Sequence, residues 1–320
     1  MIKPIRENSF NSNIIMVDGF GKSGKILMEK ILECYEDVEI HIEEEYSQLV
    51  YKLYHNGDIK EEAAIYLLKT IFDRRMYNLL ISREVNTRFK DDSSIFTYNN
   101  PLKYLKRYFS NDKNRDNFVE DANIKNKSFL VATQDALVYE DILFKTFGNR
   151  LKIIYVMRNP IEQIFDMRHY RFLERIGKSP SNTIITYKYK DKIVPLFSEG
   201  WEDEYLQKNN IYRLIRWDYE VYKKILYSLD STPIEYKNNI KIVTLDSMVF
   251  HKDKVCNILG EFLNKRITSN INRVKPNAEF LRDRYSKFKY LIEEDNNNLE
   301  LFNKLLELYG EIVNKYEILQ

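Results

Sequence analysis

Residues 14–32 constrain the fold of this 320-residue chain more than any other stretch. An apolar, β-branched run ends at Asp18, a glycine-rich turn covers residues 19–25, and helix-forming residues follow, with apolar side chains at Leu27, Ile31 and Cys34. A strand, a glycine-rich turn and a helix in this order direct backbone N–H groups into one concavity at the positive end of the helix. Two lysines in the turn add full positive charges. The stretch therefore predicts an α/β fold that binds a phosphate or a sulfate ester.

The turn departs from the usual phosphate loop at its last position. Gly19, Gly24 and Lys25 have the spacing GxxxxGK, and the next residue is normally Ser or Thr, whose hydroxyl holds Mg²⁺. Here it is Ile26, and an aliphatic side chain cannot coordinate a hard cation. The loop predicts anion binding without a metal. Two alternatives are a P-loop kinase or triphosphatase with a displaced metal ligand, and a turn with surface lysines that binds nothing.

Composition and charge narrow the class of protein. Lys and Arg total 50 against 48 Asp and Glu, so the formal net charge of +2 argues against a chain built to coat nucleic acid. Two isolated cysteines and four scattered histidines predict neither a disulfide framework nor a metal site. No apolar run is long enough to span a bilayer, and the first residues lack the apolar core of a signal peptide. We therefore expect a cytoplasmic protein.

Strand and helix patterns alternate along the rest of the chain. Further strands are predicted at residues 38–42, 129–133, 151–157 and 240–245, and the main helices at 61–81, 102–109, 140–147, 160–177 and 201–229. The alternation implies a three-layer α/β fold with a parallel sheet and right-handed crossovers. We expect one domain, 1–320, with insertions near 82–127 and 178–200 and a helical tail from about 278. The second insertion is either a flexible lid or acceptor loop, or an ordinary surface connection.

A second candidate anion site follows the strand at 151–157. Arg158-Asn159-Pro160 comes directly after that strand, and the proline suits the first turn of a helix. Ligands in parallel sheets bind at the carboxyl ends of the strands, so Arg158 is expected beside the glycine-rich turn. The alternative for Arg158 is a salt bridge at the rim of the sheet.

These two stretches together resemble the sulfotransferase family, which moves a sulfuryl group from 3′-phosphoadenosine 5′-phosphosulfate (PAPS) to an acceptor. The family motif GxxKSGTT or GxxRSGST is similar to GFGKSGKI at residues 19–26. Its second motif, a hydrophobic strand followed by R-[DN]-P, is similar to IIYVMRNP at residues 153–160, and the strand and helix at 242–263 resemble a third segment. The resemblance covers most of residues 14–263 and implies the P-loop sulfotransferase architecture with a helical C-terminal part.

The resemblance implies PAPS as the donor and assigns the loop to its 5′-phosphosulfate. Lys22 would donate to the bridging oxygen as the 5′-phosphate leaves, and Ser23 and Gly24 would help to hold that phosphate. Lys25 stands where the family has Ser or Thr and either adds a charge or faces solvent. No metal is expected, because a sulfuryl group carries less negative charge during transfer than a phosphoryl group, so lysines and backbone amides can stabilise the transition state without magnesium. The implied cofactor-binding residues of the loop are Gly21, Lys22, Ser23, Gly24, Lys25 and Ile26.

The same resemblance assigns Arg158 to the 3′-phosphate of PAPS, since an arginine fork suits a dianion. Many members place a Ser eight residues later as a second ligand, but here that residue is Asp166, whose carboxylate would repel a phosphate. Arg168 would then take its place, or else Arg273 and Lys275 near the C-terminus.

The general base and the acceptor are less defined. Many members carry a His in a T-H-x segment, where this chain has Thr133-Gln134-Asp135. Asp135 is the predicted catalytic base, with residues 43–45 (Glu-Glu-Glu) as further candidates. The alternative for Asp135 is a cap on the following helix. The acceptor would be a hydroxyl or an amine on a small molecule or a glycan. Gln134 and Asp166 also suggest a third possibility, a nucleotide- or glycan-binding protein of the same fold without catalysis.

Overall fold

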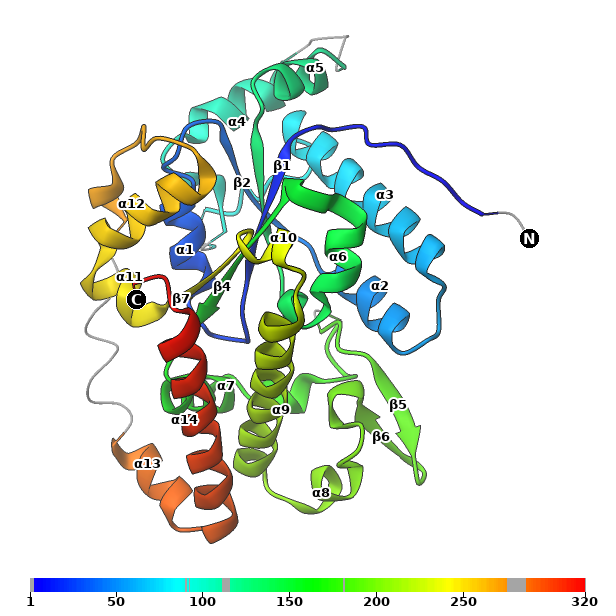
Figure 1. Ribbon diagram of the computed structural model, residues 1–320, viewed down its shortest axis with the longest axis vertical. Helices are drawn as coiled ribbons and strands as arrows, with labels where there is room; N and C mark the ends of the chain where they lie inside the picture. The colour runs from blue at the N-terminus through cyan, green and yellow to red at the C-terminus, as the bar shows by residue number, and fades with distance from the viewer. Residues whose placement is uncertain are drawn as a thin grey trace.

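A five-stranded parallel sheet runs through the middle of the computed structural model, which describes residues 3–89, 91, 93–110, 116–180, 182–274 and 286–319 (Figure 1). The strand order is β2-β3-β1-β4-β7, and neighbouring strands are parallel throughout. The sheet strands are β1 (Asn13–Asp18), β2 (Val38–Glu43), β3 (Ser128–Ala132), β4 (Leu151–Met157) and β7 (Ile240–Thr244). All five lie where the sequence predicts strands, within one residue at most ends.

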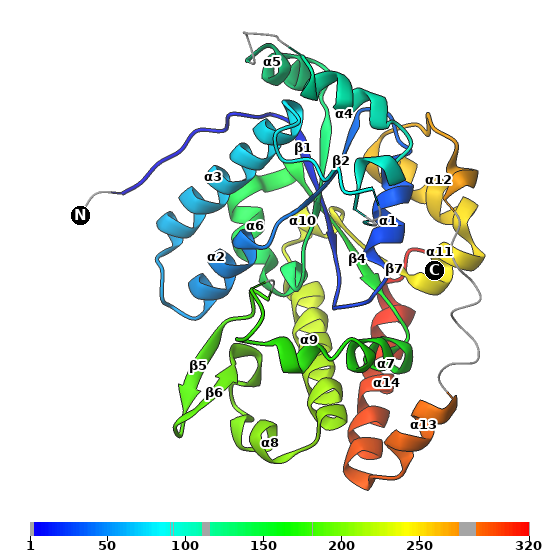
Figure 2. The same cartoon turned by 180° about the vertical axis from the view of Figure 1, so that it is seen from behind.

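Helices cover both faces of this sheet. The α-helices of the described residues are α1 (Lys25–Leu32), α2 (Tyr46–His55), α3 (Glu61–Leu80), α4 (Pro101–Tyr108), α5 (Asp116–Ile124), α6 (Glu140–Phe147), α7 (Pro160–His169), α8 (Glu202–Gln207), α9 (Asn210–Ser231), α10 (Ile234–Lys237), α11 (Leu245–Phe250), α12 (Lys252–Leu263), α13 (Ser286–Glu293) and α14 (Asn296–Tyr316). The predicted three-layer α/β architecture with a parallel sheet and a helical C-terminal part is confirmed (Figures 1 and 2).

The central strand shows why the layers form. Successive side chains of a strand point to opposite faces, and β1 is apolar on both. Ile14 and Met16 belong to a core shared with α3, α6 and α9, whereas Ile15 and Val17 belong to a second core shared with α1 and α12. All four side chains are fully buried. Continuous burial of β1 therefore requires helices on both sides of the sheet.

The strand order reverses at β1, which lies between β3 and β4. The chain therefore leaves β1 toward β2 on one side of the sheet and leaves β4 toward β7 on the other. A crevice forms between these connections, outside the carboxyl ends of β1 and β4. Figures 1 and 2 show α7, α9 and α14 in the half of the molecule beyond those ends. This arrangement positions the glycine-rich loop, the segment after β3 and the start of α7 at one edge of the sheet.

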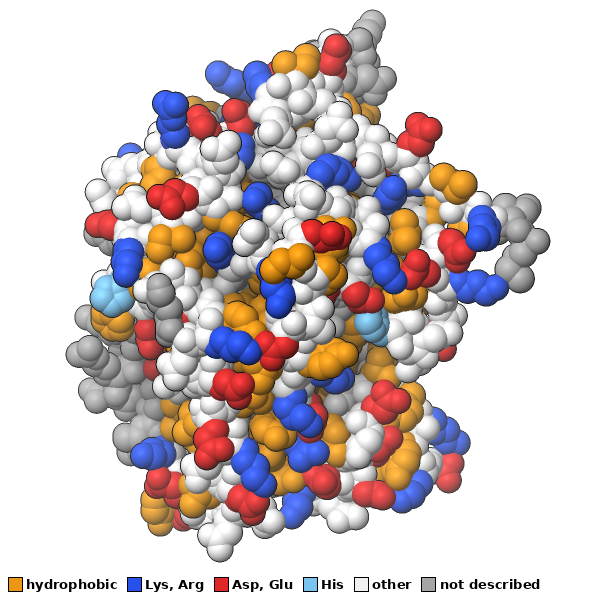
Figure 3. All heavy atoms as spheres, in the orientation of Figure 1, with side chains coloured by type: hydrophobic (Ala, Val, Ile, Leu, Met, Phe, Trp, Pro, Cys, Tyr) orange, Lys and Arg blue, Asp and Glu red, His pale blue; other side chains and the backbone are white. Residues whose placement is uncertain are grey.

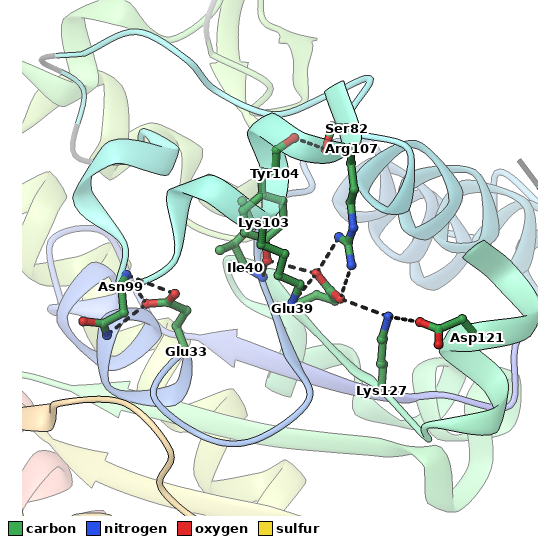
Figure 4. A network of polar contacts seen from close by, with 10 residues as sticks. All are labelled: Glu33, Glu39, Ile40, Ser82, Asn99, Lys103, Tyr104, Arg107, Asp121 and Lys127. Carbon is green, nitrogen blue, oxygen red and sulfur yellow. Dashed lines mark hydrogen bonds and ion pairs between the residues drawn. The ribbon is translucent and has the colours of Figure 1, made fainter. Parts of the chain in front are cut away.

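The first insertion contains α4 and α5 and is joined to the sheet through a buried carboxylate. Glu39 of β2 is fully buried and accepts hydrogen bonds from Tyr104 (2.9 Å) and from both Nη atoms of Arg107 (2.9 Å each). Lys103 and Lys127 also lie within 3.0 and 3.7 Å of its oxygens (Figure 4). The insertion is thus held at the outer strand of the sheet by opposite charges.

The second insertion is neither unstructured nor a plain connection. It folds into a two-stranded antiparallel hairpin, β5 (Thr186–Tyr189) and β6 (Lys192–Pro195), with Thr186 paired to Pro195 and Tyr189 to Lys192. A 3₁₀ turn that contains Phe197 follows, and Phe197 stacks on Trp217 of α9 at a centroid distance of 3.9 Å. The hairpin is therefore fixed to the sheet-side helices by aromatic packing.

Two predicted helices are wrong in length. The helix predicted over 160–177 ends at His169, because Arg171 adopts a left-handed backbone conformation with φ of 51°. The helix predicted over 201–229 is two helices, α8 and α9, and the side chain of Asn209 caps α9 by accepting from the backbone N–H of Tyr212 (2.9 Å). Helix α2 was not predicted. Local capping and turn geometry decide these boundaries, and periodicity does not reveal them.

The chain returns to the sheet after its helical tail. Helix α14 packs along α9, and the residues after it reach the edge strand β7. Ile318 donates a backbone hydrogen bond to the carbonyl oxygen of Ile242 (2.9 Å), and Ser247 donates to Glu317 (2.6 Å). Basic and acidic side chains are interspersed on the face seen in Figure 3. Over the described ranges, the structure contains no helix with the length and apolarity to cross a bilayer.

Candidate active site

Two glycines give the loop after β1 its shape. Gly19 has φ of 149°, and a Cβ there would lie 2.5 Å from the carbonyl oxygen of Val156. Gly24, at the start of α1, has φ of 105°, and a Cβ would lie 2.9 Å from a methyl carbon of Leu245. Only glycine adopts these conformations in so little space. The spacing that the sequence analysis singled out is thus a requirement of the backbone.

Lys25 is part of the loop's own support. Its ammonium donates to the carbonyl oxygens of Gly19 (2.5 Å) and Phe20 (3.3 Å), and its charge also lowers the pKa of the buried Asp18. Burial is the largest effect on Asp18 and raises its pKa overall. The side chain of Lys25 therefore folds back over the loop toward the end of β1.

Two side chains from the segment after β4 hold the other loop carbonyls. Gln163 is fully buried and donates from Nε2 to the carbonyl oxygen of Gly21 (2.8 Å). Arg158 donates from Nη1 to the carbonyl oxygen of Lys22 (3.0 Å). Because these carbonyl oxygens accept hydrogen bonds from the protein itself, the loop would bind an anion through N–H groups of the loop and of the first turn of α1.

The outer part of the loop carries the residues assigned to the phosphosulfate. Lys22 is exposed, has φ of 64°, and places its ammonium 3.7 Å from the centre of the Tyr170 ring. Ser23 is buried, and its hydroxyl has no hydrogen-bond partner among the described residues. A buried hydroxyl without a partner is costly, so a ligand oxygen would satisfy it. Ile26 is 41% exposed on the first turn of α1 and offers no oxygen ligand. These residues fit the phosphate end of a nucleotide donor.

Asp135 lies next to the loop at the end of β3. Asp18 connects the two segments, because it accepts from the backbone N–H of Leu137 (2.8 Å) and from the Thr133 hydroxyl (3.2 Å). Asp135 has φ of 63°, one carboxylate oxygen 3.2 Å from the ammonium of Lys52, and one buried oxygen without a partner. Its side chain makes no capping hydrogen bond to the following 3₁₀ turn (Ala136–Tyr139). Asp135 thus occupies the N-cap position of this turn without using its carboxylate as the cap.

A cavity of about 760 Å³ opens beside Asp135. Its wall is mixed, with charged and aliphatic side chains beside the rings of Tyr139, Phe197, Trp217 and Tyr227, and the second insertion supplies part of it. Its lining includes Lys52, His55, Asp135, Tyr139, Asp141, Ile184, Ile185, Leu196, Phe197, Glu199, Trp217 and Tyr227. Trp217 also contacts Phe20 of the loop, edge to face, at a centroid distance of 4.7 Å. The cavity is therefore coupled to the loop through one indole ring.

Three titratable groups in this region were not predicted from the sequence, namely His55 and Asp141 in the cavity wall and Asp218 on α9. His55 lies 2.7 Å from Asp141 at the cavity wall, and nothing in the sequence relates residues 86 positions apart. Asp218 of α9 is fully buried, and neither of its carboxylate oxygens has a hydrogen-bond partner in the part of the chain that the structure describes. Its pKa is raised well above the usual value by burial and by Asp135. A second buried carboxyl group, that of Asp218, thus interacts electrostatically with Asp135 near the end of β3.

Arg158 is buried and surrounded by carboxylates. Its Nε lies 3.0 Å from Glu162, and its Nη1 lies 2.7 Å from Asp166, the residue eight positions later. Burial raises the pKa of Glu162 and of Asp246, and the charge of Arg158 lowers both. The position that the family resemblance assigns to a 3′-phosphate therefore contains carboxylates of the protein itself. These residues do not fit a 3′-phosphate.

The other predicted phosphate ligands lie elsewhere. Arg168 is exposed, with its guanidinium 5.8 Å from the centre of the Phe288 ring, and it lines a separate cavity of about 630 Å³ with His169. Arg273 is exposed in a 3₁₀ turn near α12. Lys275 lies outside the described residues. The described contacts of Arg168 do not include the glycine-rich loop.

In the acidic run at residues 43–45, Glu44 is engaged in contacts within the protein. Glu44 is buried, accepts hydrogen bonds from the backbone N–H groups of Tyr46 (2.7 Å) and Ser47 (3.1 Å), and pairs with Arg75 (2.7 Å). Glu45 is the residue that precedes α2, and the side chain of Glu43 lies outside the described residues. Within the described ranges, no group of three or more His, Cys, Asp or Glu side chains could hold a metal ion.

Comparison with solved structures finds distant likenesses to sulfotransferases. The sulfotransferase domain of the Synechococcus PCC 7002 olefin synthase shares 10% identity at a TM-score of 0.46 over 98% of each chain. The sulfotransferase domain of the curacin biosynthetic pathway shares 10% identity at a TM-score of 0.43 over 92% of this chain and 97% of that one. A sulfotransferase from Alicyclobacillus acidocaldarius shares 11% identity at a TM-score of 0.41, with 93% and 96% covered.

These are structures of the family that the two sequence motifs resemble. No family model and no curated protein sequence matches the chain. At this identity and TM-score the likeness is distant, so the functional proposal below depends on the site residues alone.

Proposed function

We propose that this protein is a sulfotransferase that uses a nucleoside 5′-phosphosulfate and transfers its sulfuryl group to a hydroxyl or amine acceptor. PAPS is the donor that the sequence resemblance implies. The observation that carries the proposal is the loop between β1 and α1. It combines the buried Ser23 hydroxyl, which has no hydrogen-bond partner within the described ranges, with the exposed Lys22. Ile26 leaves that loop without the usual magnesium ligand.

The loop residues would bind and neutralise the phosphate. N–H groups at the start of α1 and the Ser23 hydroxyl are suited to its oxygens, and Lys22 supplies a positive charge where negative charge develops on the leaving phosphate. A donor of this kind supplies a sulfuryl group whose S–O bond to phosphate breaks as the acceptor oxygen or nitrogen attacks sulfur. Lys25 and Gln163 keep the loop in shape through its carbonyl groups.

The cavity beside Asp135 is the proposed acceptor site. Asp135 would accept the proton that the acceptor loses, and the His55–Asp141 pair on the same wall is a second candidate for that role. The rings of Tyr139, Phe197 and Trp217 favour an acceptor with a flat or apolar body. A small molecule fits this cavity, and an end group of a glycan is the alternative that the family analogy suggests.

Thermal stability and transfer assays test the proposal. A nucleoside 5′-phosphosulfate, tested both as adenosine 5′-phosphosulfate and as PAPS, should raise the melting temperature without magnesium, and transfer to a panel of phenols, alcohols, amines and sugars should disappear in Lys22→Ala. Lys178→Ala is the matched control, because Lys178 is an exposed lysine away from the loop. Binding of ATP or GTP only with magnesium would support a kinase or triphosphatase. Donor binding without transfer to any acceptor would support a binding protein.

A further inference from the structure

We infer that the donor site selects a nucleotide whose ribose 3′-oxygen carries no phosphate, and that Arg158 is a positioning residue for the loop. The inference rests on the proposed function, because it assumes that the loop binds the 5′-phosphate of a nucleotide. It concerns only the second anion position, at the start of α7. The matching donor is a nucleoside 5′-phosphosulfate with a free 3′-hydroxyl.

The contacts of Arg158 carry the inference. The residue is 7% exposed, and its guanidinium donates to Glu162 (3.0 Å), to Asp166 (2.7 Å) and to the carbonyl oxygen of Lys22 (3.0 Å). An arginine binds a phosphate by presenting two parallel N–H groups to it. Here Nη1 already serves both the Asp166 carboxylate and the loop, and Nε serves Glu162. The fork is therefore turned toward the protein's own acceptors.

Charge around Arg158 leads to the same conclusion. One guanidinium faces the carboxylates of Glu162 and Asp166, and its charge also acts on Asp246. A 3′-phosphate beside it would place a dianion against Asp166 at a site shielded from water, where like charges repel strongly. Removal of the carboxylate should therefore be required before a 3′-phosphate binds well.

Arg158 has another role in this arrangement. It follows β4, and through the carbonyl of Lys22 it fixes the loop that follows β1. Glu162 and Asp166 come from successive turns of α7 and hold the guanidinium in place. The arginine of the Arg-Asn-Pro motif therefore supports the loop even when no 3′-phosphate is bound.

Calorimetric titration with two product-like nucleotides tests the inference. Adenosine 5′-monophosphate and adenosine 3′,5′-bisphosphate would be titrated into the full chain and into Asp166→Ser, Asp166→Asn and the control Asp203→Ser. Asp203 pairs with Lys190 on the surface, away from the loop. The wild type should bind the monophosphate at least about tenfold more tightly, which corresponds to about 1.4 kcal/mol. Asp166→Ser and Asp166→Asn should each raise the bisphosphate affinity about tenfold. The monophosphate affinity should change by less than about threefold, because Glu162 still holds the guanidinium of Arg158 in both variants.

Two results would overturn the inference while leaving the proposed function intact. One is a wild type that binds the bisphosphate about tenfold more tightly than the monophosphate. The other is a ratio of affinities that stays the same in both Asp166 variants. If neither nucleotide binds any folded variant, the loop is not a nucleotide phosphate site, and the proposed function fails together with the inference. The Asn variant preserves side-chain size, so a loss of folding in the Ser variant alone does not prevent the test.

Discussion

Substitution of Glu39 by Gln should destabilise the protein in a way that depends on pH. Glu39 is fully buried on β2 and is surrounded by Arg107, Lys103 and Lys127 from the first insertion (Figure 4). Burial alone would raise the pKa of this carboxyl, but the hydrogen bonds from Arg107 and the charges of the two lysines lower it from 4.5 to about 2. The folded state thus strongly prefers the ionised form.

The size of the effect follows from that pKa. A difference of one pKa unit corresponds to about 1.4 kcal/mol, so ionisation of Glu39 contributes about 3 kcal/mol to the free energy of unfolding at neutral pH. Because the folded pKa is depressed, the contribution is fully present above about pH 4.5 and is lost as the pH falls toward 2. Glu39→Gln should therefore be about 3 kcal/mol less stable at pH 7, with a difference that shrinks toward zero near pH 2.

Urea unfolding followed by circular dichroism between pH 2.5 and 7 measures this difference. Glu300→Gln is the matched control, because Glu300 pairs with Lys304 on an exposed face of α14 and should change stability by less than about 0.5 kcal/mol. A Glu39→Gln variant within about 0.5 kcal/mol of the wild type at pH 7 would refute the reasoning. So would a difference that does not vary with pH.

Three further predictions concern the active site. Ser23→Ala should lower the affinity for adenosine 5′-monophosphate about tenfold by calorimetry with an unchanged melting temperature, since its hydroxyl lacks a protein partner; an unchanged affinity would remove Ser23 from the site. Gly24→Ala should destabilise the protein by about 1–2 kcal/mol, because of its positive φ and the methyl carbon of Leu245, and should weaken nucleotide binding. Gly310→Ala, where a Cβ meets open space, is its control and should be neutral or stabilising in urea unfolding. Asp135→Asn should lower kcat about 100-fold with nucleotide binding retained. If Asp135→Asn has a normal kcat and His55→Gln has a reduced one, His55 is the base.

The sequence determined the sheet and the position of the loop. Most sheet strands are local apolar runs, while apolar and polar residues alternate in β2. Because β1 is apolar on both faces, it had to be covered by helices on two sides. Gly19 and Gly24 could be recognised because the backbone itself requires glycine there, which is a property of consecutive residues. Helix ends were less predictable, because a side-chain cap such as Asn209 does not alter the apolar period.

Only the tertiary structure decided how the site is assembled. The eight-residue spacing from Arg158 drew attention to Asp166 in the sequence. The ion pair between them, and the hydrogen bond from Arg158 to the Lys22 carbonyl, became visible only with the ends of β1 and β4 packed together. The same is true of Lys25, which turned back onto the loop, and of the cavity that joins His55, Asp135 and Trp217 from three distant segments. Local patterns fix backbone conformation, whereas the partners of a buried charge depend on which elements pack together, and one sequence does not reveal that packing.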